Sequence, residues 1–293
     1  MKRQLHDKVV VITGAASGIG EALAWQCARE GARLLLADVD APRLAVVADS
    51  IRQAGTACVY QLCDVAQPQE LDALAARALK EYGGADVLIN NAGVALVDAV
   101  AQLSLENAHW LMNINFWGVV HGCRSFASQL QLRPDSVIVN VSSLFGLISI
   151  PTQSIYNASK AAVRAFSDSL REELRQRKHP SQPGQYTVGV LCVHPGGIRT
   201  RLVEQARLGD ISMLASSPKA LHANFKRIAM TSPEQAADII LQAVKQRRNR
   251  VMVGLDARMG DWLYRCFPGS ASAWFSGLTN LGMRKLQRRV KRA

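Results

Sequence analysis

The sequence predicts a doubly wound α/β fold around a seven-stranded parallel sheet. Short apolar runs alternate with longer segments of helical periodicity along most of the 293 residues, and this alternation is typical of consecutive βαβ units. A glycine-rich turn follows the first apolar run, in the position that opens the first helix of such folds. The hydrophobic fraction of 48% is sufficient for one large core.

The strand candidates are short and rich in β-branched residues. We place them at residues 9–13, 33–38, 57–63, 87–90, 136–141, 187–193 and 251–253. Segments with helical periodicity lie between them, at residues 18–30, 42–54, 68–82, 105–130, 155–178 and 233–246. Because ligands bind at the carboxyl ends of parallel strands, the residues just after each strand are the candidates for chemistry. Residues 201–231 match neither pattern and predict a long connection of the kind that forms lids and binding loops.

Charge is distributed unevenly along the chain. The net charge is +12, and residues 245–293 hold twelve Lys or Arg against only Asp256 and Asp261. The preceding body is therefore close to neutral, and no motif that reads nucleic acid accompanies the basic end, so we expect no specific nucleic-acid binding. We divide the chain into a catalytic body, residues 1–255, and a basic amphipathic extension, residues 256–293.

The six cysteines show no CxxC pair and no metal-ligand spacing, which favours buried thiols over disulfides or a zinc site. We expect no metal. The N-terminus, MKRQLHDKVV, is basic but lacks the long apolar segment of a signal peptide. Both observations favour a cytoplasmic protein.

The turn TGAASGIG, residues 13–20, predicts a dinucleotide site. Gly14, Gly18 and Gly20 allow a tight turn in which backbone N–H groups approach a pyrophosphate at the helix N-terminus. Asp38 ends the second strand about 20 residues later, where a carboxylate can bond the ribose hydroxyls and repel a 2′-phosphate. This favours NAD over NADP. Asp40 is close enough to share the role, and Arg43 is the one nearby cation that weakens the preference.

Tyr156 and Lys160 are spaced by one turn of a predicted helix and therefore lie on the same face. A phenol has a pKa near 10, but an adjacent ammonium favours the phenolate and lowers that pKa. Tyr156 is then a candidate proton donor to a carbonyl, or acceptor from an alcohol.

Six motifs together resemble the short-chain dehydrogenase/reductase (SDR) family. They are TGAASGIG (13–20), NNAG (90–93), NINFWG (113–118), VSSLFG (141–146), YNASK (156–160) and HPGGIRT (194–200), in the order and spacing of that family. The resemblance covers about residues 6–255. It implies a Rossmann-type fold and hydride transfer between a nicotinamide cofactor and a substrate that Ser143 and Tyr156 polarise.

The resemblance also assigns roles to single residues. Ser143 is implied as the hydroxyl that bonds the substrate oxygen, with Ser142 as the competing choice, since only one of two successive strand residues can face the site. Asn115 is implied to hold a water that links Lys160 to solvent, although an Asn inside a helix is often bonded locally. Trp117 and His121 are interpreted as packing. The implied cofactor contacts are Thr13, Gly14, Ser17, Gly18, Ile19, Gly20, Asp38, Asp64, Val65, Asn91, Ala92, Gly93, Tyr156, Lys160, Pro195, Gly196, Ile198 and Thr200, and the Asn90–Gly93 segment is also expected to steady the sheet.

Two apolar walls are expected around the substrate. One is formed by Leu144, Phe145, Leu147 and Ile148; the other by Leu202, Ile211, Met213, Leu214, Leu221, Phe225, Ile228 and Met230. They favour a lipophilic alcohol or ketone of steroid, retinoid, terpenoid or fatty type. The alternative is that many of these residues are core beneath a lid.

In the extension, Met259, Trp262, Leu263, Cys266 and Phe267 have the spacing of a one-faced helix, which Pro268 and Gly269 end. Trp274, Phe275, Leu278 and Leu281 follow, and then six basic residues between Arg284 and Arg292. This composition favours peripheral contact with an anionic membrane surface, which for a cytoplasmic protein is the inner one. The alternatives are packing on its own or a partner subunit, and a disordered end.

The sequence therefore predicts an NAD-preferring oxidoreductase for a lipophilic secondary alcohol and its ketone. The competing assignments are a 3-oxoacyl (carrier protein) reductase, which Asp38 disfavours because reductive biosynthesis usually uses NADPH, and a non-catalytic cofactor-sensing protein. The resemblance implies a homodimer or homotetramer.

Overall fold

In the computed structural model, residues 3–176, 178–179, 182–186, 188–212, 214–215, 217–275 and 277 are described. Their main sheet consists of β1 (Val9–Thr13), β2 (Arg33–Asp38), β3 (Cys58–Leu62), β4 (Val87–Asn90), β6 (Ser136–Val141), β9 (Val188–Pro195) and β11 (Arg250–Val253). The strand order is β11-β9-β6-β4-β1-β2-β3, and every neighbouring pair runs parallel. The predicted doubly wound sheet is confirmed, with strand ends within two residues of those expected.

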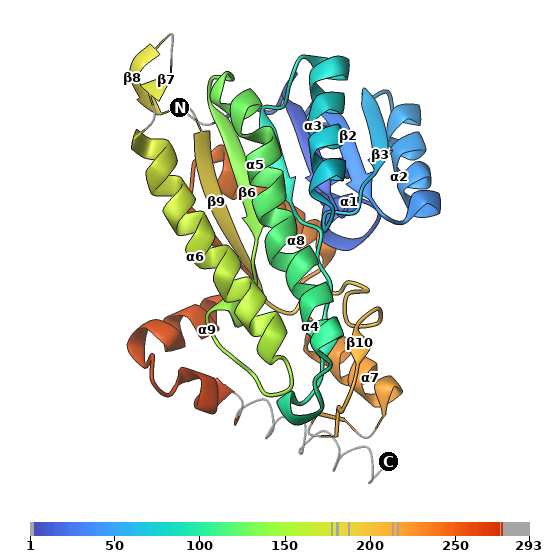
Figure 1. Cartoon of the computed structure of the whole chain (residues 1–293), viewed down its shortest axis with the longest axis vertical. Coiled ribbons are helices and arrows are strands. Elements are labelled where there is room, and N and C mark those ends of the chain that lie inside the picture. The colour runs from blue at the N-terminus through green and yellow to red at the C-terminus, as the bar shows by residue number, and fades with distance from the viewer. Residues whose placement is uncertain are drawn as a thin grey trace.

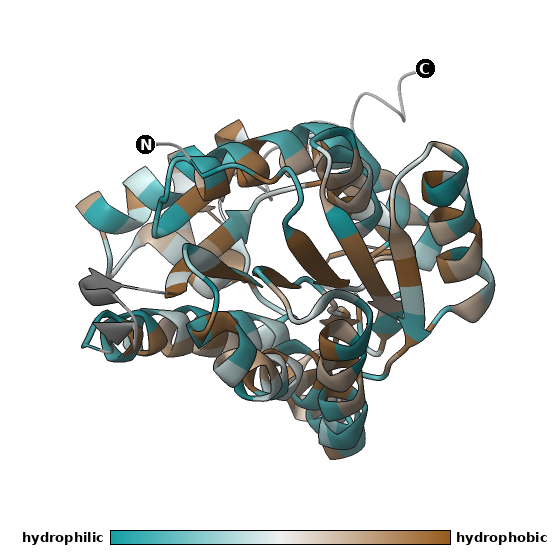
Figure 2. Ribbon diagram, turned by 90° about the horizontal axis from the view of Figure 1, so that it is seen from above, coloured by the Kyte–Doolittle hydropathy of each residue, from teal (hydrophilic) through white to brown (hydrophobic). Residues whose placement is uncertain are grey.

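Helices cover both faces of the sheet (Figures 1 and 2). One layer holds α1 (Gly18–Arg29), α2 (Ala41–Gln53) and α8 (Pro233–Lys245); the other holds α3 (Pro68–Tyr82), α5 (Gly118–Gln131) and α6 (Ser154–Gln176). Along β1, Val10 and Ile12 pack into the first layer and Val11 into the second, as the two-residue period of a strand requires. The two resulting apolar cores fix the sheet between the helix layers.

The helix predicted at residues 105–130 is interrupted. It consists of α4 (Leu105–Met112), a π-helical turn at Asn113–Trp117, and α5. The side chain of Asn115 lies wholly buried in this turn and bonds the backbone of Val94. A wider turn does not change the apolar periodicity enough to appear in the sequence.

Residues 201–231, for which the sequence predicted a long connection, contain two elements. The strand β10 (Arg207–Leu208) pairs in parallel with β5 (Leu96–Val97), and α7 (Pro218–Ile228) follows. Both lie at the end of the molecule to which the sheet strands point (Figure 1). At the opposite end, β7 (Lys178–His179) and β8 (Gln182–Tyr186) form a hairpin that the sequence did not predict.

The extension begins with α9 (Leu255–Cys266), so the helix expected there is confirmed. It packs against residues 144–148 through a small apolar cluster that includes Leu144, Ile148, Ala257 and Ala271. Residues 271–275 are helical again after the turn at Pro268 and Gly269. Met213, Leu278, Leu281 and the basic residues from Arg284 to Arg292 lie outside the described residues.

Candidate active site

The glycine turn is held between β1 and β4. The side-chain amide of Asn91 donates to the carbonyls of Thr13 and Gly14, both at 3.0 Å. The hydroxyl of Thr13 accepts from the backbone N–H groups of Asn91 and Ala92, at 3.1 and 3.2 Å. A Cβ at Gly14 would lie 2.7 Å from Cα of Ala92. The turn therefore needs glycine for close backbone approach, and the hydrogen bonds of Thr13 and Asn91 fix its conformation.

A cleft of about 440 Å³ opens at the carboxyl ends of the strands. Most of the residues expected to contact the cofactor line it: Gly14, Ser17, Gly18, Ile19, Asp38, Asp64, Val65, Asn91, Ala92, Gly93, Tyr156, Lys160, Pro195, Gly196, Ile198 and Thr200. Thr13, Gly20 and Asn115 do not line it and instead support its wall. The cleft also includes residues that were not among the expected contacts, namely Ala16, Val39, Cys63, Val94, Ile114, Val141, Arg201 and Gln205. Val39 and Cys63 directly follow a strand and Val141 ends one, which is the signal that could have found them. Ala16 and Ile114 lie inside two of the six motifs.

This cleft fits a dinucleotide. Gly14 and Gly18 have positive φ angles of 65° and 58°, and the glycine turn leads into the N-terminus of α1. The side chain of Ser17, just before α1, makes no capping bond, which leaves the first N–H groups of the helix for an anionic group.

Asp38 lies at the end of β2 and lines the cleft. Its carboxylate accepts three backbone hydrogen bonds, from Ala16 at 2.9 Å, Val39 at 2.8 Å and Asp40 at 3.1 Å. Arg43, the nearby cation, forms an ion pair with Asp40 at 3.2 Å. The carboxylate of Asp38 is thus held in place by backbone donors, and Arg43 is drawn toward a different acid.

Ser143 and Tyr156 meet at the centre of the cleft. Both side chains are buried, and the hydroxyl of Ser143 acts on the phenol of Tyr156, where it lowers the pKa that burial raises. The hydroxyl of Ser143 also accepts from the N–H of Phe145 at 3.1 Å. Ser142, the competing serine, donates instead to the carbonyl of Lys160 at 2.7 Å. Of the two serines, only Ser143 therefore directs its hydroxyl effect to the tyrosine.

Lys160 lies one helical turn after Tyr156 on α6, as the spacing predicted. Its ammonium is 5.9 Å from the centre of the tyrosine ring and donates to the carbonyl of Val141 at 3.0 Å. Burial lowers the pKa of Lys160 to about 8. Burial also raises the pKa of Tyr156, and the group that opposes this shift is Ser143 rather than the lysine expected from the sequence. The physical reason is that the ammonium points to Val141 and not to the phenol oxygen.

Asn115 supports the site from behind. Its side-chain oxygen accepts from the N–H of Val94 at 2.8 Å, and its nitrogen donates to the carbonyl of Val94 at 2.9 Å. A Cβ at Gly93 would lie 3.2 Å from that oxygen and 3.4 Å from Nζ of Lys160. Both the oxygen and the nitrogen of the Asn115 amide are thus hydrogen-bonded to the backbone of Val94. Gly93 lies between this amide and the ammonium of Lys160.

His194 is a site residue that sequence reasoning missed, although it is the first letter of the HPGGIRT motif. It is completely buried at the end of β9, and its Nδ1 lies 3.0 Å from the carbonyl oxygen of Ser143. Burial lowers its pKa to about 4. The neutral ring therefore donates from Nδ1 and fixes the backbone at Ser143.

The walls of the cleft are only partly those expected. Leu202 and Phe225 line it, and the ring of Phe145 packs edge-on against Tyr156 with centroids 6.5 Å apart. Leu144, Leu147 and Ile148 pack toward α9 instead, and Ile228 and Met230 are exposed. Ile211, Leu214 and Leu221 form a separate core with Val97 beneath the long connection, because β5 and β10 pair there and enclose them.

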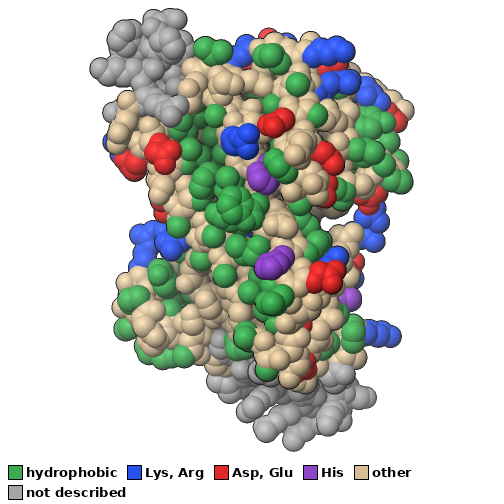
Figure 3. Space-filling model, viewed as in Figure 1, with side chains coloured by type: hydrophobic (Ala, Val, Ile, Leu, Met, Phe, Trp, Pro, Cys, Tyr) green, Lys and Arg blue, Asp and Glu red, His purple; other side chains and the backbone are tan. Residues whose placement is uncertain are grey.

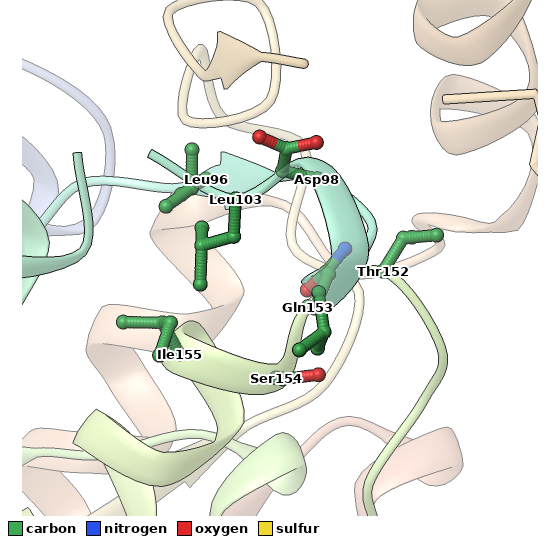
Figure 4. Close-up of a pocket in the computed structure, with 8 residues that line it drawn as sticks. Leu96, Asp98, Leu103, Thr152, Gln153, Ser154 and Ile155 are labelled. Carbon is green, nitrogen blue, oxygen red and sulfur yellow. The ribbon is translucent and has the colours of Figure 1, made fainter. Parts of the chain in front are cut away.

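A second, shallow hollow lies between β5 and the start of α6 (Figure 4) and offers no space for a ligand. Asp98, one of its residues, is buried and accepts from the N–H of Asp210 at 2.9 Å. This contact holds the long connection against β5. The described residues contain no group of three or more His, Cys, Asp or Glu side chains arranged to hold a metal ion.

Comparisons with known proteins agree with this geometry. A family model described as short chain dehydrogenase matches residues 8–210. A protein of Mycobacterium tuberculosis that bears the name of an oxidoreductase, SadH, is 38% identical over 90% of this chain and 92% of its own length. The "11-beta-hydroxysteroid dehydrogenase-like 6" of Arabidopsis thaliana is 33% identical over 91% of this chain and 75% of its own.

Solved structures match as well. A short chain dehydrogenase/reductase from Burkholderia phymatum in complex with NAD has a TM-score of 0.78 and 30% identity, and the match covers 90% of this chain and 94% of that one. An alcohol dehydrogenase from Thermococcus sibiricus, complexed with 5-hydroxy-NADP, has a TM-score of 0.68 and 25% identity over 84% and 95% of the two chains.

Proposed function

Since the chain belongs to the short-chain dehydrogenase/reductase family and is an NAD(P)-dependent oxidoreductase, we propose that it prefers NAD and interconverts a lipophilic secondary alcohol and its ketone. The observation that carries this proposal is the convergence of Ser143, Tyr156 and Lys160 in the one cleft that Asp38 also lines.

In the proposed reaction, Tyr156 donates a proton to the substrate oxygen during reduction and accepts it during oxidation. Ser143 bonds the same oxygen and keeps it beside the phenol. A bound nicotinamide cofactor supplies or accepts the hydride. Lys160, with a pKa of about 8, is a cation at neutral pH. It would favour the phenolate only after its ammonium turns from the carbonyl of Val141 toward the phenol oxygen. Asn115 and Gly93 lie behind the lysine, and the water relay implied for Asn115 is part of this proposal.

The preference for NAD rests on charge. The carboxylate of Asp38 is fixed by three N–H groups at the end of β2, where it repels a 2′-phosphate and accepts bonds from ribose hydroxyls. Arg43, which a phosphate would need, is paired with Asp40. The same charge argues against a 3-oxoacyl reductase that uses NADPH.

The lipophilic substrate class rests on the wall residues. Phe145 and Leu202 pack in one apolar cluster with Tyr156, and Phe225 faces the cleft from α7. A bulky apolar group beside the reacting oxygen would contact these three side chains.

Two further expectations complete the proposal. Apolar side chains gather in the middle of the molecular face that α5 and α6 form (Figure 3), and Trp117 is 47% exposed, which supports association into a homodimer or homotetramer. The cytoplasmic location stays a prediction. None of the described helices is both long and apolar enough to cross a membrane.

The test is turnover of a panel of steroid, retinoid, terpenoid and fatty alcohols, with a 3-oxoacyl thioester included, using NAD and NADP side by side. We expect NAD to be reduced with one lipophilic class. The variant Tyr156→Phe should lose about 100-fold or more in kcat while it still binds NADH. Asp38→Ala should shift the ratio of kcat/KM for NAD to that for NADP about tenfold toward NADP.

Three outcomes would contradict parts of this proposal. Turnover of the thioester with NADPH alone would support the reductase. Tight NADH binding without turnover of any substrate would support a cofactor sensor. An unchanged cofactor ratio in Asp38→Ala would show that another residue selects the nucleotide.

A further inference from the structure

The helix α9 packs against the body through the face that carries its small residues. Ala257 and Gly260 are buried against the body, and a Cβ at Gly260 would lie 2.6 Å from Cδ1 of Leu144. The large apolar side chains of the helix lie on the other side: Leu255, Met259 and Trp262 are 65%, 70% and 64% exposed. The apolar stripe expected from the sequence is therefore turned mostly outward.

The exposed apolar surface continues beyond the helix. Phe267 and Trp274 are also exposed, and their rings lie together with centroids 4.7 Å apart. We call Leu255, Met259, Trp262, Phe267 and Trp274 the outer patch. Each of these five side chains is at least 42% exposed, and a cluster of this kind on a folded protein usually marks an interaction surface.

The charges around the outer patch are positive. Arg258 is exposed, and the side chain of Arg265 is 64% exposed. Residues 255–275 contain two carboxylates. Asp256 accepts from the N–H of Gly197, away from the patch. Asp261 pairs with Arg250 at 2.6 Å and with Arg265 at 3.1 Å, so one carboxylate is shared by two guanidinium groups and the net charge beside the patch stays positive. The sequence after the patch, residues 276–293, adds six basic residues and no acid.

We propose that the outer patch docks on the surface of a membrane that contains anionic lipids. Exposed Trp and Met side chains insert among lipid headgroups and acyl chains, and the surrounding Arg and Lys side chains are attracted to anionic lipids. A second copy of the chain fits less well, because a two-fold interface would bring Arg258 and Arg265 close to the same cations of its partner. Residues 276–293 would likewise add positive charge beside these arginines.

Two contacts connect the extension to the active site, so docking through α9 could affect the site. Asp256 bonds the N–H of Gly197, next to Gly196 of the cleft. The ring of Phe275 packs edge-on against Phe145, with centroids 6.3 Å apart, and Phe145 packs in turn against Tyr156. The proposal goes beyond the reaction and does not depend on which alcohol is used, but it places the site next to the phase in which a lipophilic alcohol dissolves.

The test is co-sedimentation of the full chain with vesicles of phosphatidylcholine alone and of phosphatidylcholine with about one third phosphatidylserine. We expect binding to the anionic vesicles that weakens as salt is raised. The double variant Met259→Ser with Trp262→Ser should bind them about tenfold more weakly. The matched control replaces Val46 and Leu79, which are equally exposed on α2 and α3, by serine and should bind like the unmodified protein.

Thermal unfolding and NADH binding of both double variants establish that each is folded. Equal vesicle binding by the two variants would overturn the proposal, since the basic residues 284–292 would then bind lipid without the patch. Equal binding to neutral and anionic vesicles would also overturn it. So would a patch variant that changes oligomeric state in size-exclusion chromatography without a loss of lipid binding, because the patch would then be an interface between copies.

Discussion

At the scale of single residues, Lys160 belongs to the proposed catalytic group but destabilises the folded chain while its side chain is charged. Its ammonium is buried and has one described hydrogen-bond partner, the carbonyl of Val141, and burial lowers its pKa to about 8 from a usual value near 10.5. Between these two pH values the unfolded chain keeps the proton that the folded chain has released. The contribution of Lys160 to the free energy of unfolding must therefore rise as the pH rises from about 8 to 10.5. Below pH 8 the charged form of Lys160 destabilises the fold.

We predict that Lys160→Met is inactive yet more stable than the unmodified protein at pH 7, by on the order of 1–3 kcal/mol, and that this advantage shrinks by pH 10. Urea unfolding of both proteins at the two pH values measures it. Burial also raises the pKa of several thiols, and these groups lower the stability of both proteins as the pH rises above 9. The difference in stability between the two proteins removes this shared effect. A constant difference between the two proteins would contradict the prediction.

Single residues also show what the sequence can and cannot predict about the site. The spacing of Tyr156 and Lys160 places them on one helix face, and the structure agrees. The choice between Ser142 and Ser143 depended on family resemblance. The bond of Ser142 to the carbonyl of Lys160 and the effect of Ser143 on the pKa of Tyr156 support it. The role of His194 was not predictable, because its contact with Ser143 joins residues 51 positions apart.

At the scale of elements, the contact between α1 and β1 depends on Gly20. A Cβ at this position would overlap the carbonyl oxygen of Gly14. Replacing Gly by Ala inside a helix normally gains about 1 kcal/mol from helix propensity, but overpacking against backbone costs about 1–3 kcal/mol or more. The steric cost is larger because backbone cannot rotate away as a side chain can.

We therefore predict that Gly20→Ala destabilises the protein and weakens NADH binding, since the displaced turn lines the cleft. Gly269→Ala is the control, because a Cβ there meets nothing within 4 Å. Urea unfolding and NADH fluorescence titration measure both effects. Equal stability of the two variants would show that α1 can shift without cost.

The elements that the sequence predicted well are those with a strong local signal. The apolar runs of β1, β2 and β4 were placed to the residue, because strands buried on both faces are continuously apolar. The π-helical turn at Asn115 and the pairing of β5 with β10 were not predicted. Both depend on partners distant in sequence, Val94 for the first and residues 207–208 for the second, and two-residue strands carry no period of their own.

At the scale of the whole molecule, the extension is a structural part of the body as far as residue 275. It contacts Leu144 through Gly260, Gly197 through Asp256, and Ser149 through the hydroxyl of Ser272 at 3.1 Å. Local periodicity predicted the α9 helix but could not predict which face it buries, because Ala257 and Gly260 fit close to the body where Met259 and Trp262 do not.

The reactivity of the cysteines can measure unfolding of the whole molecule, because five of them are spread through its core. Cys27, Cys58, Cys63, Cys123 and Cys192 are buried in or beside the sheet and its two helix layers, and Cys266 at the end of α9 is exposed. Burial raises the pKa of the first four thiols to about 12 and that of Cys192 to about 11. The thiolate is the reactive form, so these five are both inaccessible and protonated at neutral pH.

We predict that a chromogenic disulfide reagent at pH 8 reacts rapidly with one thiol per native chain and with all six after unfolding in urea. Cys266→Ser should abolish the rapid reaction. The remaining five should react together, because the two apolar cores share one sheet and are expected to unfold in one transition. Rapid reaction of a second thiol in the native chain would show that part of the sheet opens independently. Because Cys266 lies beside Phe267 of the outer patch, anionic vesicles should also slow its reaction, while neutral vesicles leave it unchanged.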